Sequence, residues 1–156
     1  MTRIKVIIGT NETEKLQYLE NSKDYITYYN PENDKHPSIQ KEFIENLVQD
    51  ANIFEKNICI ATNSPYVLTV LNNLLYAGKL RNKISADKFV EIMGNKYNYI
   101  LPYELDVINL DTNKSIVDDE IVTEEIDTIS DTINEQYTAL YYEEQRIEAL
   151  NIVKHL

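Results

Sequence analysis

Short apolar runs alternate with longer amphipathic stretches along this chain. The runs at 4–8, 25–29 and 58–61 predict β-strands, and the second is polar enough for an edge strand. Between them, apolar positions spaced by three and four residues predict a helix over residues 36–54, whereas residues 14–19 predict either a short helix or a loop. This alternation is typical of an α/β fold with a mainly parallel sheet flanked by helices.

The segment 57–78 predicts a buried strand, a polar loop and an apolar helix in direct succession. Ser64 is a favourable N-cap and Pro65 a favourable first helical residue. Apolar residues then recur at helical spacing as far as Gly78, which we expect to be the residue just after the helix. Loops that follow a sheet strand in this way often carry function.

The remaining residues predict a short helix, two strands and a long final helix. The helix is expected at 86–93 and the strands at 97–101 and 105–110. A turn signal at 111–113, followed by the apolar run 115–117, predicts a C-terminal β-hairpin. A helix over residues 123–150, packed on the sheet or against a partner, is predicted by one apolar stripe: Ile126, Ile129, Ile133, Tyr137, Leu140 and Tyr141.

Composition limits the classes of function. With 156 residues and 43% hydrophobic content, residues 1–156 are expected to form a single domain. The formal net charge of -11 argues against direct nucleic-acid binding, because Lys and Arg supply most of the affinity for phosphate backbones. The sequence contains no window of the ~20 apolar residues that a membrane span needs, so we expect a cytoplasmic protein. Cys59 lies in an apolar strand and is expected to be a small buried hydrophobe.

Phosphate-binding loops are not expected. The segment from Gly9 to Lys15 follows a strand, as a P-loop does, but the chain has only three glycines and none stands at the second glycine position of that motif. Glu12 and Glu14 would also repel phosphate.

No metal site is predicted either. The two histidines, His36 and His155, are far apart in sequence, and His36 is better explained by the start of a helix. An acidic run is expected to be a solvated helix start favoured by the helix dipole; its members are Asp118, Asp119, Glu120, Glu124, Glu125, Asp127 and Asp131.

Two segments, in the expected order, resemble one protein family. The residues Thr62-Asn63-Ser64-Pro65-Tyr66 are similar to the Thr-His-Ser-Pro switch segment of the overcoming-lysogeny-defect-like and RecF-like branch of ABC-type ATPases (AAA-type ATP-binding proteins). Upstream, the strand at 25–29 with Asn30-Pro31-Glu32, followed by residues 36–41, resembles the Walker B strand, the acidic corner and the helix start of that family. The resemblance covers about residues 24–145 and implies a partial P-loop NTPase-like lobe.

The departures from the family pattern concern the catalytic groups. Tyr29 and Asn30 occupy the positions of the family's acidic pair, and Asn63 occupies the position of its γ-phosphate-sensing His. A phenol and an amide cannot replace those acids at neutral pH. The resemblance therefore implies no catalytic residue and vestigial nucleotide-facing positions at Tyr29, Asn30, Glu32, Asn63 and Ser64.

Three functions are compatible with these observations. The resemblance implies a catalytically degenerate ATPase-like protein, without cofactor, that docks on a full-length ABC-type ATPase as a non-hydrolysing or regulatory subunit. Alternatively, the chain binds ATP and Mg²⁺ only in a complex whose P-loop is supplied by a partner, with Asn63 at the γ-phosphate and Glu32 positioning water. A third possibility is a self-associating or partner-binding module, unrelated to nucleotides, such as a homodimer that associates through Tyr137, Tyr141 and Tyr142.

Overall fold

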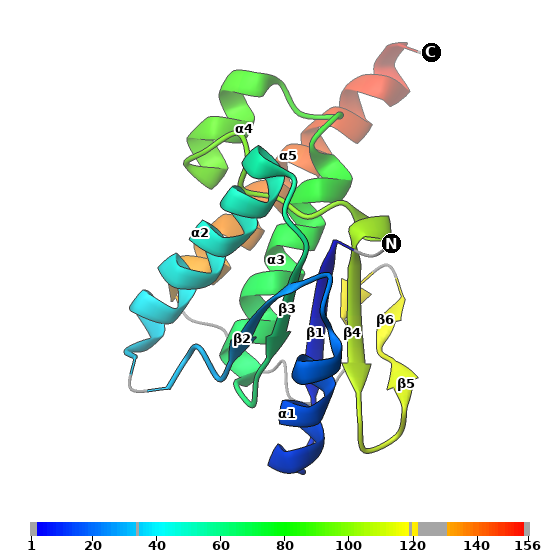
Figure 1. Cartoon of the computed structure of the whole chain (residues 1–156). Coiled ribbons are helices and arrows are strands. Elements are labelled where there is room, and N and C mark those ends of the chain that lie inside the picture. The colour runs from blue at the N-terminus through cyan, green and yellow to red at the C-terminus, as the bar shows by residue number, and fades with distance from the viewer. Residues whose placement is uncertain (1–2, 34, 119, 122–130, 155–156) are drawn as a thin grey trace.

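The structure is a computed structural model that describes residues 3–33, 35–118, 120–121 and 131–154, and it has an α/β fold (Figure 1). The strands are β1 (Ile4–Ile8), β2 (Ile26–Tyr29), β3 (Ile58–Ala61), β4 (Leu105–Asn109), β5 (Lys114–Ser115), β6 (Val117–Asp118) and β7 (Glu120–Ile121). The helices are α1 (Glu12–Asn21), α2 (Pro37–Phe54), α3 (Pro65–Leu80), α4 (Ala86–Met93), α5 (Asp131–Lys154) and the short 3-10 helix η1 (Pro102–Glu104).

The main sheet is mixed but mostly parallel, as the sequence predicted. Its strand order is β2-β3-β1-β4-β5, in which the first four strands are parallel and β5 pairs antiparallel with β4. The pairing of Ile108 with Ser115 and of Asn109 with Lys114 confirms the predicted hairpin. β6 and β7 form a separate two-stranded sheet. Because β2, β3 and β1 are parallel neighbours, the loops that follow them emerge at the same edge.

The two faces of the sheet are covered unequally. Alternate side chains of β1, such as Ile4 and Val6, pack with α2 and α3 in the larger core, which α5 also joins through Leu140. Ile7 points to the opposite face and packs with Leu19 of α1 in a smaller cluster. Figure 1 accordingly shows α1 alone in front of the sheet, with α2, α3 and α5 behind it. The second face thus has a small core.

Side-chain caps start α2 and α3 at the positions that the sequence indicated, whereas α1 starts earlier. Ser64 accepts a hydrogen bond from the N–H of Val67, and Pro65 is the first residue of α3. His36 caps α2 in the same way, which confirms its role as a helix start. Asn11 caps α1, so that this helix begins earlier and is longer than the short helix or loop predicted at 14–19.

Gly78 does not end α3, contrary to the sequence prediction, because the helix continues to Leu80. The glycine is needed for packing instead. A Cβ atom at this position would lie 1.8 Å from the carbonyl oxygen of Ile100, so only a glycine lets residues 100–101 cross the helix this closely.

The prediction of a strand at 97–101 is also wrong. These residues form a turn and irregular backbone, and several of their polar groups bond to helices. Asn52 of α2 donates to the carbonyl oxygens of Tyr97 and Tyr99, each at 2.8 Å, and the N–H of Ile100 donates to the Leu74 carbonyl of α3. The apolar pattern therefore marks burial against helices, not a strand.

The final helix, predicted at 123–150, is observed at 131–154. The acidic run was predicted to start a helix, which is wrong for Asp118 in β6 and Glu120 in β7, whereas Asp131 is the first residue of α5. The other members of the run, with Ile126 and Ile129, lie outside the described residues. Leu140 is fully buried, as its place in the apolar stripe predicted, whereas Tyr137 and Tyr141 are exposed. None of the described helices combines the length and apolarity needed to cross a lipid bilayer.

Candidate functional site

The candidate site lies where β1, β2 and β3 end. The loops after these strands contain Gly9 to Asn11, Asn30 to Glu32 and Thr62 to Ser64, respectively. Since the strands are adjacent and parallel, four of the five vestigial positions predicted from sequence, Tyr29, Asn30, Glu32 and Asn63, come together there. The fifth, Ser64, faces α2 instead: it caps α3 and its hydroxyl donates to Gln40 Oε1 at 3.1 Å.

The carboxylate of Glu12, in the first turn of α1, is the centre of this site. Its Oε1 atom accepts from Asn63 Nδ2 at 2.7 Å and lies 2.9 Å from Lys15 Nζ. Its Oε2 atom accepts from the Tyr29 hydroxyl and, over 3.5 Å, from Asn30 Nδ2. Four donors from three separate chain segments therefore converge on one carboxylate. We refer to Glu12, Lys15, Tyr29, Asn30 and Asn63 as the Glu12 cluster.

Lys15 forms the floor of the Glu12 cluster. Its side chain is 0% exposed, whereas that of Glu12 is 44% exposed. The ammonium group bonds to Glu12 and also donates to Asn63 Oδ1. A buried ammonium is tolerated only with such partners, because burial of an unpaired charge is very costly. The cluster is thus open to solvent at Glu12 and Asn63 and closed at Lys15.

Two further carboxylates bind backbone N–H groups at the same edge. Glu32 Oε1 accepts from the N–H of Asn63 at 3.0 Å. Asp111, in the hairpin turn after β4, accepts from the N–H of Thr10 at 3.0 and 3.1 Å through its two oxygens. Backbone N–H groups in loops after parallel strands are the usual ligands of phosphate groups. Here, the N–H groups of Thr10 and Asn63 are bound by side chains of the same chain.

The protonation behaviour of the cluster follows from these contacts. Hydrogen bonds from Tyr29, Asn63 and Lys15 lower the pKa of Glu12 from its ordinary value of 4.5 to about 2. The hydrogen bond to Glu12 raises the pKa of Tyr29 above 10.0, so that this phenol is neutral at pH 7. A carboxylate with so low a pKa is a poor general base at neutral pH, and a neutral phenol cannot polarise water as an acid pair would.

Asn30 holds a strained backbone position at the start of its loop. Its φ of 43° is left-handed, a conformation that Asn tolerates better than most residues, and its N–H donates to the Ala61 carbonyl. Asn30 Oδ1 and Glu32 Oε2 are buried acceptors without a hydrogen-bond partner in the described part of the chain. Within that part, no group of three or more His, Cys, Asp or Glu side chains could hold a metal ion.

Sequence reasoning missed Glu12, Lys15 and Asp111 as members of this edge. The spacing from Gly9 to Lys15 equals that between the first Gly and the Lys of the motif G-x-x-x-x-G-K-[ST], and this spacing could have placed Lys15 at the site. The missing second glycine, with Glu14 in its place, argues against phosphate binding but says nothing about bonds between the segment and the other loops. No local signal pairs Asp111 with Thr10, because they lie on different strand connections.

Cys59 is a buried residue of β3, as the sequence predicted, and it lies away from the Glu12 cluster on the face covered by α1. Burial raises the pKa of its thiol, which makes it unsuited to nucleophilic chemistry at neutral pH.

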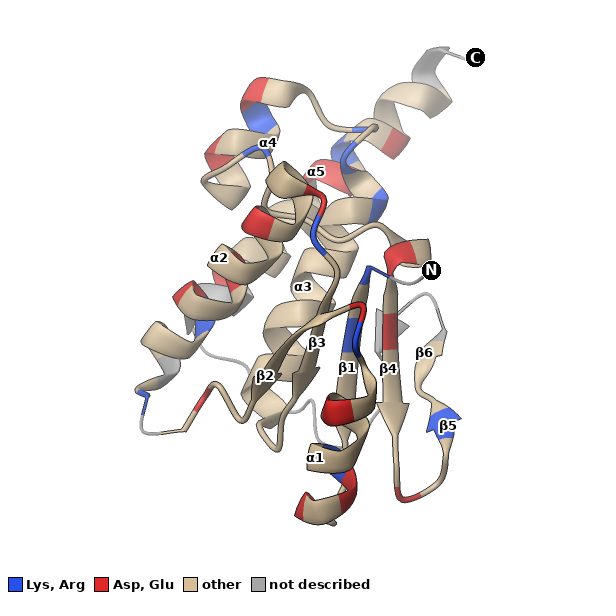
Figure 2. Cartoon of the chain, in the orientation of Figure 1, with Lys and Arg blue, Asp and Glu red and all other residues tan. Residues whose placement is uncertain are grey.

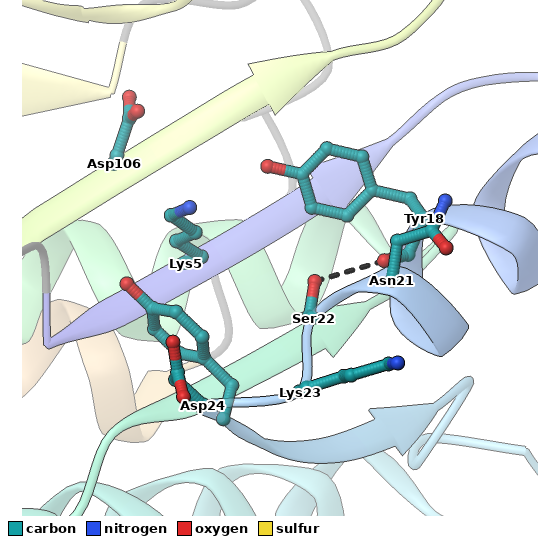
Figure 3. A pocket seen from close by; sticks show the side chains of 8 residues that line it. Lys5, Tyr18, Asn21, Ser22, Lys23, Asp24 and Asp106 are labelled. Carbon is teal, nitrogen blue, oxygen red and sulfur yellow. Dashed lines mark hydrogen bonds between the residues drawn. The ribbon is translucent and has the colours of Figure 1, made fainter.

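A separate open pocket lies on the α1 side of the sheet, toward the amino ends of the strands (Figure 3). Lys5 and Asp106 are register partners on β1 and β4, and the Lys5 ammonium lies 4.9 Å from the ring centre of Tyr25. Burial alone would lower the pKa of Lys5, but Tyr18 and Tyr25 raise it on balance. The pocket is the part of this sheet face that α1 leaves uncovered.

Charged residues of both signs are mixed along α2, α4 and α5 (Figure 2). Ion pairs such as Lys41 with Glu45 and Arg146 with Glu143 neutralise several of the basic side chains. The described surface therefore shows no basic stripe of the kind that binds nucleic acid. Comparisons with protein-family models, with curated proteins and with solved structures found no match to this chain.

Proposed function

We propose that this chain is a catalytically degenerate ATPase-like subunit that docks on a full-length ABC-type ATPase without hydrolysing ATP itself. The observation that supports this best is the convergence of Tyr29, Asn30 and Asn63 on Glu12 at the carboxyl edge of the parallel sheet. These are the positions at which the resembling family carries its acidic pair and its sensor His. On this proposal these positions keep their place at the sheet edge, and their side chains bond to Glu12 instead of to a nucleotide.

The donor and acceptor groups at this edge are poorly suited to bind ATP and Mg²⁺ when the chain is alone. Lys15 already has two partners within the chain, and the N–H groups of Thr10 and Asn63 are bound by Asp111 and Glu32. Magnesium is usually bound through one or two carboxylates together with substrate phosphates. The carboxylates at this edge instead accept hydrogen bonds from neighbouring loops.

Docking is tested by co-expression of the tagged chain with a full-length ABC-type ATPase from the same genome, followed by mass photometry of the purified material. We expect a complex with wild type and a weakened complex with Tyr29→Arg, which places a cation at the carboxyl edge of the sheet. Tyr103→Arg is the matched control, because Tyr103 is 78% exposed in η1, at the amino end of β4. Absence of any complex, or equal weakening by both variants, contradicts docking through this edge.

Hydrolysis and binding of nucleotide are tested separately. Purified chain is expected to release no phosphate from ATP above the buffer rate, because the cluster offers neither a metal-holding acid pair nor a base near neutral pKa. ATP turnover by the pure chain, lost on Lys15→Met, would overturn the proposal.

A second candidate is an ATP-binding component whose P-loop comes from a partner. The unpartnered buried acceptors Asn30 Oδ1 and Glu32 Oε2 favour it, since oxygen atoms are the ligands that Mg²⁺ prefers. Titration calorimetry of ATP with Mg²⁺ separates the two: binding by the complex that exceeds binding by the ATPase alone supports the second candidate, and no added binding supports the first.

Self-association is an alternative outcome of the same mass measurement. Tyr137, Tyr141 and Tyr142 on α5 are 49%, 44% and 67% exposed, and Tyr137 packs on the ring of Tyr76. A stable dimer of this chain alone that is broken by Tyr142→Glu would favour the module unrelated to nucleotides.

A further inference from the structure

The Glu12 cluster has the donor set of a binding site for a small oxyanion. A fully buried ammonium, two side-chain amides and one hydroxyl point to a common centre, and they come from α1, the end of β2 with its loop, and the loop after β3. Sites for phosphate or sulfate are built in this way, from a cation and several neutral donors held by separate elements.

One feature distinguishes this centre from an ordinary surface ion pair. Exposed ion pairs leave both side chains free to move, and they contribute little to stability. Here Lys15 is fixed under the sheet edge with no exposed surface, while the anion that neutralises it is about half exposed at the mouth. The cation is part of the fold, and the carboxylate is the part that can turn out into solvent.

We infer that Glu12 is an internal ligand: its carboxylate fills an oxyanion site formed by Lys15, Tyr29, Asn30 and Asn63 and thereby excludes inorganic phosphate. When the carboxylate is removed, the site accepts phosphate. The inference concerns contacts within this chain and does not require docking on an ATPase, so that its failure would leave the proposed function standing.

Removing the carboxylate tests this directly. Glu12→Ala leaves the four donors in place and exposes Lys15, whereas Thr13→Ala changes the next, exposed residue of α1 and serves as the matched control. Each variant and wild type are melted in increasing sodium phosphate and in sodium chloride of equal ionic strength, with circular dichroism as the readout. For Glu12→Ala we expect a saturable rise in Tm of about 3–6 °C at a phosphate concentration about ten times the dissociation constant.

Wild type and Thr13→Ala are expected to show no rise beyond the chloride control. The double variant Glu12→Ala, Lys15→Met is expected to lose the phosphate effect, because the floor of the site then lacks its cation. If Glu12→Ala proves unfolded in chloride, phosphate should restore its native circular dichroism spectrum, since phosphate replaces the missing partner of Lys15.

Four results would overturn the inference. The first is a phosphate-dependent rise in Tm that is equal in wild type and Glu12→Ala, and the second is a rise in Glu12→Ala no greater than that in Thr13→Ala. The third is a rise that persists in the double variant without Lys15. The fourth is an unfolded Glu12→Ala whose native circular dichroism spectrum phosphate does not restore. The first would mean that Glu12 does not occupy the site, and the third that the anion binds elsewhere.

Discussion

Replacement of Gly78 by alanine tests the packing that corrected the sequence prediction. The new Cβ atom would lie 1.8 Å from the Ile100 carbonyl oxygen and 2.6 Å from its carbonyl carbon, where ordinary van der Waals contacts begin at 3.4 Å. Both contacts are backbone, so no side chain can rotate away. Residues 100–101 or the helix itself must move by more than an ångström.

The size of the effect follows from opposing contributions. Overpacking of a core costs about 1–3 kcal/mol, and a weakened hydrogen bond from the Ile100 N–H to the Leu74 carbonyl costs about 1 kcal/mol more. Alanine gains about 1 kcal/mol of helix propensity over glycine inside α3. We therefore expect Gly78→Ala to lose about 1–3 kcal/mol of unfolding free energy, which lowers Tm by about 2–12 °C.

Urea unfolding followed by circular dichroism measures this loss. The control is Gly94→Ala, at a glycine with φ 82° and no atom within 4 Å of the added Cβ, where the cost is limited to the about 1–2 kcal/mol of a left-handed residue. If Gly78→Ala is as stable as wild type or more stable, then helix propensity dominates at this position and the close crossing of residues 100–101 over α3 is refuted.

Three further outcomes are expected. The folded pKa of Glu12 is lowered to about 2, so its stabilising effect is present above its ordinary pKa of 4.5 and is lost as pH falls from there toward 2. Glu12→Gln should therefore show a smaller decline of Tm than wild type over this pH window. Parallel Tm curves for the two proteins would contradict this expectation. Native protein should leave Cys59 unlabelled by a thiol reagent until urea unfolds it, and immediate stoichiometric labelling would show that the thiol is accessible. Asn52→Ala should cost about 1–3 kcal/mol in urea unfolding, since the Tyr97 and Tyr99 carbonyls lose their donor; an unchanged midpoint would mean that water replaces it.

Local patterns predicted the order of elements along the chain. The strands at 4–8 and 58–61 and the helices α2 and α4 agree with the predicted ranges to within a residue, since periodicity and capping residues act over a few neighbouring positions. At residues 14–19 the local signals were ambiguous, and the sequence was insufficient to choose between a helix and a loop. At residues 97–101 the apolar pattern came from burial against helices rather than from strand pairing, and it was misleading.

The candidate site was predictable only in part. Four vestigial positions taken from the family resemblance gather at the carboxyl edge, but Ser64 bonds to Gln40 away from the cluster. Glu12, the common partner of Tyr29, Asn30 and Asn63, was expected only as a group that repels phosphate. A sequence can show that a carboxylate is present, but the residues that surround it depend on strand order.

The sequence by itself determined the α/β alternation and the helix starts at His36 and Ser64. Only the tertiary structure decided that β1 lies between β3 and β4, that Gly78 serves a backbone crossing, and that Lys15 is buried against Glu12 and Asn63. The physical reason is the separation of the residues along the chain. Propensities and caps depend on adjacent residues, whereas these contacts join groups that become neighbours only when the parallel sheet assembles.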